Sequence, residues 1–364
     1  MKVKNKHYRT VWMEKGVVKL INQTLIPHKF EIKTSANYQE TAKAIKDMIV
    51  RGAPAIGAAA AYGIVQAVNA ANSSNFGEYI KQAEICLKNT RPTAKDLFTA
   101  IDYVMEVIKD ETSLEKIKSI VFNRAEEYAN KSADACKKIG EYGAELIKDG
   151  DIIETHCNAG WLACVDWGTA LSPIYHAKQQ GKQIFVYVDE TRPRCQGSNL
   201  TAWELAEEGV PHRVIPDNAG AYYMSKGVSM MMVGADRIAA NGDVANKIGT
   251  YEKAIVAKEF GIPFYVAAPM STFDLSCLSG KDIPIEERSE DEVAYVHGWS
   301  DNGNFSRVRI MPVKSRACNP SFDVTPSKYI AGIITEKGII KPDNESILNL
   351  FAVNNVAEFE GVKK

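Results

Sequence analysis

The stretch DIIETHCNAGWLAC, residues 151–164, decides the fold class of this 364-residue chain. Its apolar beginning is typical of a short buried strand, which stops abruptly in Asn158, Ala159 and Gly160. Cys157 stands where the strand gives way to this turn of small residues. A structural cysteine would be expected deeper in the core, whereas a cysteine at a strand end can face a substrate.

Four more apolar runs follow the first one, and helical segments are predicted between most of them. The runs are QIFVYVD, HRVIP, VSMMMVG and PFYVAA, and the helical segments are residues 169–180, 201–208 and 251–260. Alternating strands and helices favour a mostly parallel sheet with helices on both faces. We therefore expect an α/β fold with a Rossmann-like sheet, and one more strand at RVRIMPV, residues 307–313.

The first part of the chain has a different pattern. Short apolar runs on either side of residues 14–16 predict a small β-ribbon, and residues 37–71 predict two helices that are broken at Arg51-Gly52. Two further helices are predicted at residues 93–109 and 114–148. We therefore expect an N-terminal domain of β-ribbon and helical bundle, residues 1–130, followed by the Rossmann-like domain, residues 131–364.

The composition is that of an ordinary globular protein, with 45% hydrophobic and 24% charged residues. A net charge of -1 attracts no polyanion, so no nucleic-acid partner is expected. Seven scattered cysteines without a CxxC pair are typical of a reduced intracellular protein. The N-terminus lacks the apolar core of a signal peptide, and residues 53–71 are mostly alanine, which favours a buried helix over a membrane span. We expect a cytoplasmic protein without membrane association.

Ligands of an open parallel sheet bind at the carboxyl ends of its strands, so the residues just after each run are candidates for a site. Asp236 follows VSMMMVGA, and a carboxyl group in such apolar surroundings could serve as a general acid. His156 precedes Cys157, but neighbouring strand residues face opposite sides, so no Cys–His pair is expected. From the residues alone, Cys157 is equally a small buried apolar residue, and Asp236 a helix cap or a partner of Arg237.

Three places combine a cation with the predicted start of a helix, which is the combination that binds phosphate. VRGAPAIG places Arg51 and Gly52 before a proline in the first helical turn. TRPTAKDL places Arg91 before another helix, and ANKIGTYEKA places Asn246 and Lys247 before a third. Each cation could instead be solvated on the surface, which is the usual position of Arg and Lys.

Several familiar cofactor motifs do not occur in the sequence. There is no GxGxxG that opens a helix, no GxxxxGK[ST], no HExxH and no GxSxG. Binding of nicotinamide, ATP or zinc is therefore not indicated, and neither a cofactor nor a metal ion is expected.

Seven long motifs between residues 12 and 326 together resemble the methylthioribose-1-phosphate isomerase family. They are RGAPAIG, TRPTA, THCNAG, DETRPRCQGSNLTAWEL, GADRIAANGDVANKIGTYEKA, IPIEER and NPSFDVTP. This family is related to the regulatory subunits of the eukaryotic initiation factor that exchanges guanine nucleotide. Those relatives share the fold but are not isomerases.

The resemblance implies an aldose–ketose isomerase that converts 5-methylthioribose 1-phosphate to 5-methylthioribulose 1-phosphate in methionine salvage, and it implies a homodimer. By the same likeness, Cys157 and Asp236 are the catalytic pair. Substrate binding is implied for Arg51, Gly52, Ala53, Arg91, Gln196, Asn246 and Lys247. Gln196 rests on the resemblance alone.

The implied chemistry makes sense of these residue types. The phosphate on the anomeric oxygen prevents the ring from opening like a free hemiacetal, and a neutral Asp236 could donate a proton to the ring oxygen. A hydrogen must also move from C2 to C1. Cys157 could carry it as a proton through an enediol, or assist a hydride shift in a dry pocket. The sequence leaves both routes open.

Trp161 departs from the small residue that usually follows THCNAG in the family. Its ring could reshape the pocket near the C5 substituent of the sugar, or it could point into the core. 5-Deoxyribose 1-phosphate therefore stays open as a substrate. Ribose 1,5-bisphosphate would need a second cationic site, and a non-catalytic, translation-factor-like subunit is the alternative from a different class.

Overall fold

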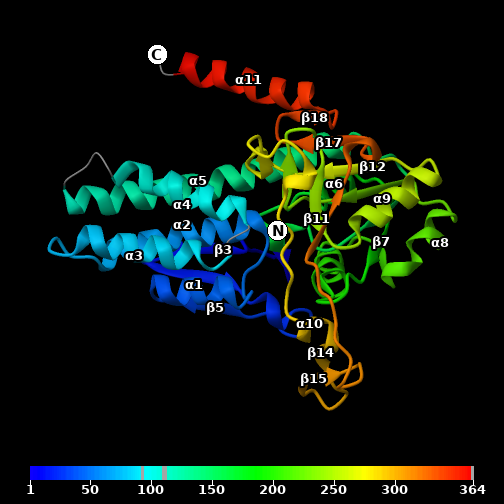
Figure 1. Ribbon diagram of the computed structural model, residues 1–364, viewed down its shortest axis with the longest axis horizontal. Helices are drawn as coiled ribbons and strands as arrows, with labels where there is room; N and C mark the ends of the chain where they lie inside the picture. Colours follow the sequence, from blue (N-terminus) through cyan, green and yellow to red (C-terminus); the bar gives the residue numbers. More distant parts are fainter. Residues whose placement is uncertain (92–93, 109–112, 362–364) are drawn as a thin grey trace.

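The computed structural model describes residues 1–91, 94–108 and 113–361, with side chains as far as residue 352. Among these residues, seven strands form the main sheet in the order β18-β17-β12-β9-β6-β7-β8 (Figure 1). They are β6 (Ile152–Thr155), β7 (Phe185–Asp189), β8 (His212–Ile215), β9 (Met230–Val233), β12 (Phe264–Ala267), β17 (Gly332–Thr335) and β18 (Gly338–Ile340). Neighbouring strands from β17 to β8 pair in parallel, and β18 is antiparallel to β17.

The side chains of β9 show why helices cover both faces of the sheet. Met230 and Met232 pack into one apolar core with α5 (Leu114–Ala144) and α6 (Ser172–Gln179). Met231 and Val233 pack into another core with α8 (Gly220–Met224) and α9 (Thr250–Glu259). A strand that is buried on both faces reads as a continuous apolar run, as VSMMMVG does. The predicted Rossmann-like α/β fold is confirmed.

The strand order determines where a ligand can bind. From β6 the chain builds β7 and β8 on one side, and then crosses to add β9, β12 and β17 on the other side. Connections leave β6 and β9 in opposite directions, and ligands of open α/β sheets bind at such a switch point. Cys157 follows β6, and Asp236 follows β9.

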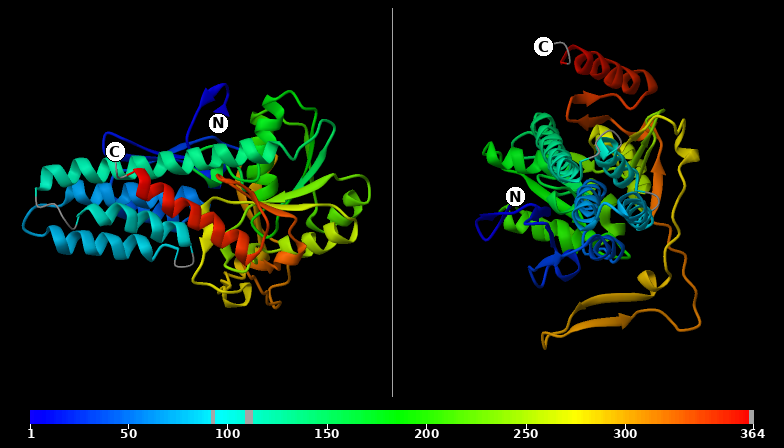
Figure 2. Two further views of the ribbon diagram at one scale, coloured as in Figure 1. Left: turned by 90° about the horizontal axis from the view of Figure 1, so that it is seen from above. Right: turned by 90° about the vertical axis from the view of Figure 1, so that its left-hand side faces the viewer.

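The N-terminal part contains the predicted ribbon and helices. The ribbon is β3 (Val11–Glu14), β4 (Val17–Ile21) and β5 (Ile32–Ser35), and the helices are α1 (Tyr38–Lys46), α2 (Ala53–Ala70), α3 (Phe76–Lys88), α4 (Lys95–Met105) and α5. The alanine-rich α2 is buried at the centre of this bundle, where small side chains allow close packing (Figure 2).

The helix α3 was not predicted from the sequence. Of the helix predicted at 93–109, both end residues lie outside the described ranges. Residue 130 lies within α5, and the domain division there stays a prediction.

A second, smaller sheet was not predicted from the sequence. It has the order β13-β10-β11-β16 and consists of β13 (Phe273–Asp274), β10 (Arg237–Ala239), β11 (Val244–Lys247) and β16 (Phe322–Thr325). The additional strand predicted at residues 307–313 is present with shifted bounds, as β15 (Phe305–Arg309). It pairs with β14 (Tyr295–Trp299) in a hairpin that projects from the body (Figure 1).

Further elements lie outside these sheets and the helical bundle. Strands β1 (Lys2–Val3) and β2 (Lys6–His7) pair at the N-terminus, α7 (Ala202–Glu207) precedes β8, α10 (Asp291–Ala294) precedes β14, and α11 (Asn344–Gly361) lies near the C-terminus. None of the helices in the described ranges has both the length and the apolar character that crossing a membrane requires.

Candidate active site

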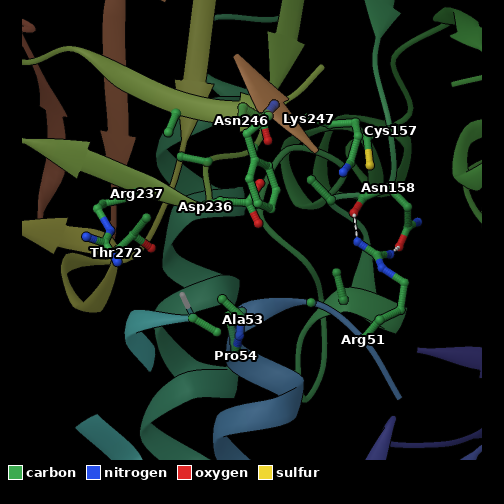
Figure 3. Close-up of a pocket in the computed structure, with 18 of the residues that line it drawn as sticks. Arg51, Ala53, Pro54, Cys157, Asn158, Asp236, Arg237, Asn246, Lys247 and Thr272 are labelled. Atoms are coloured by element: carbon green, nitrogen blue, oxygen red, sulfur yellow. Dashed lines mark hydrogen bonds between the residues drawn. The ribbon is translucent and has the colours of Figure 1, made fainter. Parts of the chain in front are cut away.

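One pocket collects all the residues that the sequence analysis proposed for the site. It lies between the ends of β6 and β9, strand β11, and the first turn of α2 (Figure 3). The residues that line it include Arg51, Gly52, Ala53, Arg91, Cys157, Gln196, Asp236, Asn246 and Lys247. Cys157 and Asp236 therefore open into the same cavity, although 79 positions separate them (236 − 157).

Cys157 is a buried residue in an uncommon backbone conformation, with a φ of 63°. Its N–H donates to Thr191 Oγ1 at 2.8 Å, and its carbonyl oxygen accepts from Thr201 Oγ1 at 2.6 Å. The ring of His156 is engaged elsewhere, with Nδ1 2.9 Å from Asp189 Oδ2 and Nε2 2.8 Å from the carbonyl oxygen of Ile248. As expected, the two neighbours do not form a nucleophile–base pair.

Asp236 is half-buried between β9 and β10, on another wall of the pocket. Its N–H donates to the carbonyl oxygen of Ala245 at 2.9 Å, which ties it to β11. Arg237 Nη1 lies 3.3 Å from Asp274 Oδ2. Asp236 precedes a strand and not a helix, so the alternative that it is a helix cap is wrong.

Five cations of the described part of the chain line the pocket: Arg51, Arg91, Arg237, Lys247 and Arg288, of which Arg237 is paired with Asp274. Burial lowers the pKa of Lys247 to about 8, with the charges of Arg288 and Arg51 adding to this effect and those of Cys157 and Asp236 opposing it. Burial, followed by the repulsion of Arg288, lowers the pKa of Arg91. These cations are not solvated surface residues, and their mutual repulsion favours an anionic ligand among them.

The first turn of α2 also faces this pocket. Gly52 is its N-cap residue with a φ of 92°, and a Cβ atom at that position would lie 2.2 Å from the carbonyl oxygen of Ala163. A glycine is required here because no other residue combines this φ with such close backbone approach. The orphan N–H groups and positive end of an 18-residue helix are suited to an anion.

Gln196 and Asn246 supply neutral polar groups. Gln196 is 7% exposed, and its Oε1 has no hydrogen-bond partner within the described part of the chain. An orphaned buried acceptor that lines a pocket is suited to a ligand hydroxyl group. Asn246 Nδ2 donates to Thr250 Oγ1 at 3.1 Å, and Lys247 Nζ donates to the carbonyl oxygen of Ser321 at 2.6 Å.

The sequence analysis missed two pocket residues that have clear contacts. Asn158 accepts from Arg51 through both its Oδ1, at 2.7 Å, and its carbonyl oxygen, at 3.1 Å (Figure 3). Arg288 lies with its guanidinium carbon 5.9 Å from the centre of the Phe322 ring. Both residues stand inside motifs that had been singled out, THCNAG and IPIEER, but residue type alone did not distinguish them from surface groups.

Trp161 does not reshape the pocket. It is fully buried and its ring lies 6.0 Å from that of Trp203, in the core that α6 and β6 share. Trp161 is not among the lining residues. A substituent at C5 of a sugar bound in this pocket would therefore not contact it.

One group of potential metal ligands lies together in the described part of the chain: His156, Asp189 and Asp217. His156 and Asp189 bond to each other, and the two oxygens of Asp217 accept the N–H groups of Thr191 and Arg192 at 2.7 and 2.6 Å. These donor atoms already have protein partners, so the group is explained as part of the support behind β6 and β7.

Comparison with known proteins places the chain among relatives that match nearly its full length. The initiation factor 2 subunit family matches residues 49–342. The methylthioribose-1-phosphate isomerase of Acetivibrio thermocellus is 49% identical over 333 residues, which cover 90% of this chain and 95% of the relative. That of Methylocella silvestris is 46% identical over 364 residues, with 96% and 98% covered.

Two solved structures are similar over the same extent. The 5-methylthioribose 1-phosphate isomerase of Pyrococcus horikoshii is 42% identical with a TM-score of 0.87, and 96% of this chain and 97% of that chain are covered. The translation initiation factor eIF-2B, subunit delta, of A. fulgidus is 42% identical with a TM-score of 0.82, and 94% and 100% are covered. This chain therefore belongs to the methylthioribose-1-phosphate isomerase family, within the wider initiation factor 2 subunit family.

Proposed function

We propose that this chain converts 5-methylthioribose 1-phosphate to 5-methylthioribulose 1-phosphate, an aldose–ketose isomerisation of methionine salvage. The observation that carries the proposal is the shared pocket: Cys157 and Asp236 lie at the ends of two adjacent strands and line one cavity with five cations. Relatives that are named for this activity match almost the entire chain.

The phosphate of the substrate is held by the cations and the start of α2. Arg288 and Arg51 each repel both Arg91 and Lys247, so a phosphate dianion among these cations relieves their repulsion. The N–H groups at Gly52 and Ala53 extend this anion site. The phosphate then fixes C1 and C2 of the sugar between the two catalytic residues.

Ring opening and hydrogen transfer are divided between these two residues. Asp236 donates a proton to the ring oxygen while the C1–O bond to that oxygen breaks, and the phosphate ester is retained. Cys157, as a thiolate, removes the proton from C2 to form an enediol and returns it to C1, while the Asp236 carboxylate takes the proton of the C2 hydroxyl as the C2 carbonyl forms, which restores both residues. Gln196 accepts a hydrogen bond from a sugar hydroxyl with its unpartnered Oε1.

The test of these roles compares Cys157→Ala and Asp236→Asn with Cys86→Ala, which changes a half-buried cysteine on α3, outside the pocket. Each pocket variant should lose at least about 100-fold in kcat with little change in thermal unfolding, whereas the control should retain full activity. Full activity in either pocket variant would refute the assigned role.

Turnover in D2O separates the two hydrogen-transfer routes. Deuterium at C1 of the product would support the enediol route. Complete retention of the C2 hydrogen, together with residual activity of Cys157→Ser, would support a hydride shift instead.

The preferred substituent at C5 of the sugar is tested by comparing kcat/KM for three sugar phosphates. We expect 5-methylthioribose 1-phosphate to be preferred over 5-deoxyribose 1-phosphate, because apolar residues such as Met48, Ile56 and Phe322 also line the pocket. Ribose 1,5-bisphosphate is the third substrate, because Arg237 adds a further cation to the lining. No turnover of any of the three, with copurification of a heteromeric factor, would favour a regulatory subunit like the A. fulgidus relative.

We also propose that the protein is a cytoplasmic homodimer. A light-scattering mass of one chain would contradict the dimer, and fractionation of cells tests the compartment.

A further inference from the structure

The turn that carries Cys157 is held at both ends by threonines from one later segment, residues 189–205. Thr191 Oγ1 accepts the N–H of Cys157, and Thr201 Oγ1 donates to its carbonyl oxygen. Both threonines are fully buried. A left-handed φ is unfavourable for a residue with a Cβ atom, and it persists only where surrounding contacts enforce it. The two hydroxyl groups supply such contacts at Cys157.

Glu204 holds the next part of the same turn. Its fully buried carboxylate accepts from Asn158 Nδ2 at 2.8 Å, Leu162 N at 3.2 Å, Trp161 N at 2.8 Å and Tyr175 Oη at 2.8 Å. A carboxylate has about four acceptor positions, so these donors occupy all of them. Burial raises the pKa of Glu204 to about 7, and the hydrogen bonds oppose this rise.

Gly160 shows how closely the turn fits this carboxylate. A Cβ atom at Gly160 would lie 1.9 Å from Glu204 Oε2. The small residues of the turn, which first marked it in the sequence, are therefore needed for contact with a buried acid.

The contacts of Glu204 continue into the pocket through Asn158. Because the amide NH2 group of Asn158 donates to Glu204 and Thr201, its Oδ1 is left to accept from Arg51 Nη1. The opposite amide orientation would point two N–H groups at a guanidinium. Glu204 thus selects the orientation of Asn158 that holds Arg51.

We infer that Glu204, Thr201 and Thr191 are positioning residues for the isomerisation: Glu204 orients Arg51 through Asn158, and the two threonines fix the backbone of Cys157. This inference rests on the proposed function for its kinetic consequences. It also explains why the motif DETRPRCQGSNLTAWEL is longer than a single contact from Gln196 would require.

Glu204→Gln tests the arm that leads to Arg51. A glutamine has one NH2 group, which replaces either Oε2, where it faces Trp161 N–H and Tyr175 Oη, or Oε1, where it faces Leu162 N–H and Asn158 Nδ2. In the first orientation the turn loses the acceptor of Trp161 N–H, and in the second Asn158 can bond to the NH2 group only by rotating its amide, which repels Arg51. We expect KM for 5-methylthioribose 1-phosphate to rise on the order of 10–100-fold.

Thr201→Val tests the arm that leads to Cys157, with Thr335→Val as a matched control. Thr335 is also fully buried and bridges a turn. Its Oγ1 donates to the carbonyl oxygen of Gly338 at 2.9 Å and accepts a hydrogen bond from Lys337 N–H at 3.1 Å. It lies outside the pocket lining. We expect Thr201→Val to lower kcat about 10-fold and to change KM by less than twofold relative to the wild type. Thr335→Val should change neither constant, even if both variants lower the thermal midpoint equally.

Hydrogen–deuterium exchange of the free full chain gives a readout that is independent of any substrate. Glu204→Gln and Thr201→Val should both accelerate exchange in peptides that contain residues 157–162, whereas Thr335→Val should not. Unchanged exchange there, or kinetic constants within twofold of the wild type, would overturn the inference. A wild-type protein that turns over none of the sugar phosphates would refute the proposed function, and the exchange rates would still decide on the positioning role.

Discussion

Replacing Lys247 by methionine should stabilise the free protein at pH 7 while it weakens phosphate binding. Lys247 is 6% exposed, and burial lowers its pKa from 10.5 to about 8. Keeping the ammonium charged at pH 7 therefore costs the folded state about 3 kcal/mol. Methionine has a similar length and no charge, but it leaves the carbonyl oxygen of Ser321 without its 2.6 Å hydrogen bond, at a cost of about 1 kcal/mol. The expected net gain in the free energy of unfolding is about 2 kcal/mol.

The pH dependence of this gain has a definite sign. Because the pKa of Lys247 is lower in the folded than in the unfolded protein, the unfolded chain binds more protons between about pH 8 and pH 10.5. The stability of the wild type should therefore rise, relative to that of the variant, as pH increases through this window. At the upper end of this pH window Lys247 is uncharged in the folded wild type, so the cost of a buried charge disappears. Lys247→Met should then be less stable than the wild type, because it lacks the hydrogen bond to Ser321.

Urea unfolding at pH 7 and pH 10, with and without inorganic phosphate, measures both effects. The matched control is Lys253→Met, because Lys253 is also buried but lies 3.3 Å from Asp189 Oδ1 and 3.8 Å from Glu154 Oε1. Burial raises the pKa of Glu154 to about 8, so at pH 7 the loss of Lys253 leaves chiefly the buried Asp189 carboxylate without its ion pair, which should destabilise the fold by about 3–5 kcal/mol. The reasoning is refuted if Lys247→Met is less stable than the wild type at pH 7, or if its advantage is the same at pH 10. Phosphate should stabilise the wild type more than Lys247→Met.

Three other substitutions test the geometry of the site. Gly52→Ala should lower the free energy of unfolding by at least about 2 kcal/mol and reduce kcat/KM, because Gly52 has a φ of 92° and its added Cβ would collide with Ala163. The control Gly77→Ala, in open space on α3, should not destabilise the fold. Arg288→Met should raise KM for the sugar phosphate by about 10–100-fold through the loss of a charged contact, and the exposed control Arg316→Met should leave KM unchanged in the same steady-state assay. Trp161→Phe should alter the ratio of kcat/KM for the methylthio and deoxy substrates by less than twofold, and a larger change would place Trp161 at the ligand.

The elements of the main sheet could be predicted from the sequence because their signals are local. VSMMMVG is apolar at every position since β9 is buried on both faces, and the alanines of α2 read as a helix packed on all sides. The strands β10, β11 and β16 could not be read in this way. Each is only three or four residues long, and such short segments become strands only when they pair with other segments of the chain.

The candidate site divides in the same manner. Sequence pattern and family likeness were enough to propose Cys157, Asp236 and the other candidate residues that line the pocket, because each stands in a motif near the end of a predicted element. That Cys157 and Asp236 share one cavity depends on the strand order, which puts β9 beside β6 and places both residues at the switch point. The burial of Trp161, the approach of Arg288 and the contacts from Glu204 to the turn are likewise tertiary facts. Local pattern determines which residues form a strand or helix, but charge and side-chain packing between distant segments decide what each residue faces, and only the folded chain brings those segments together.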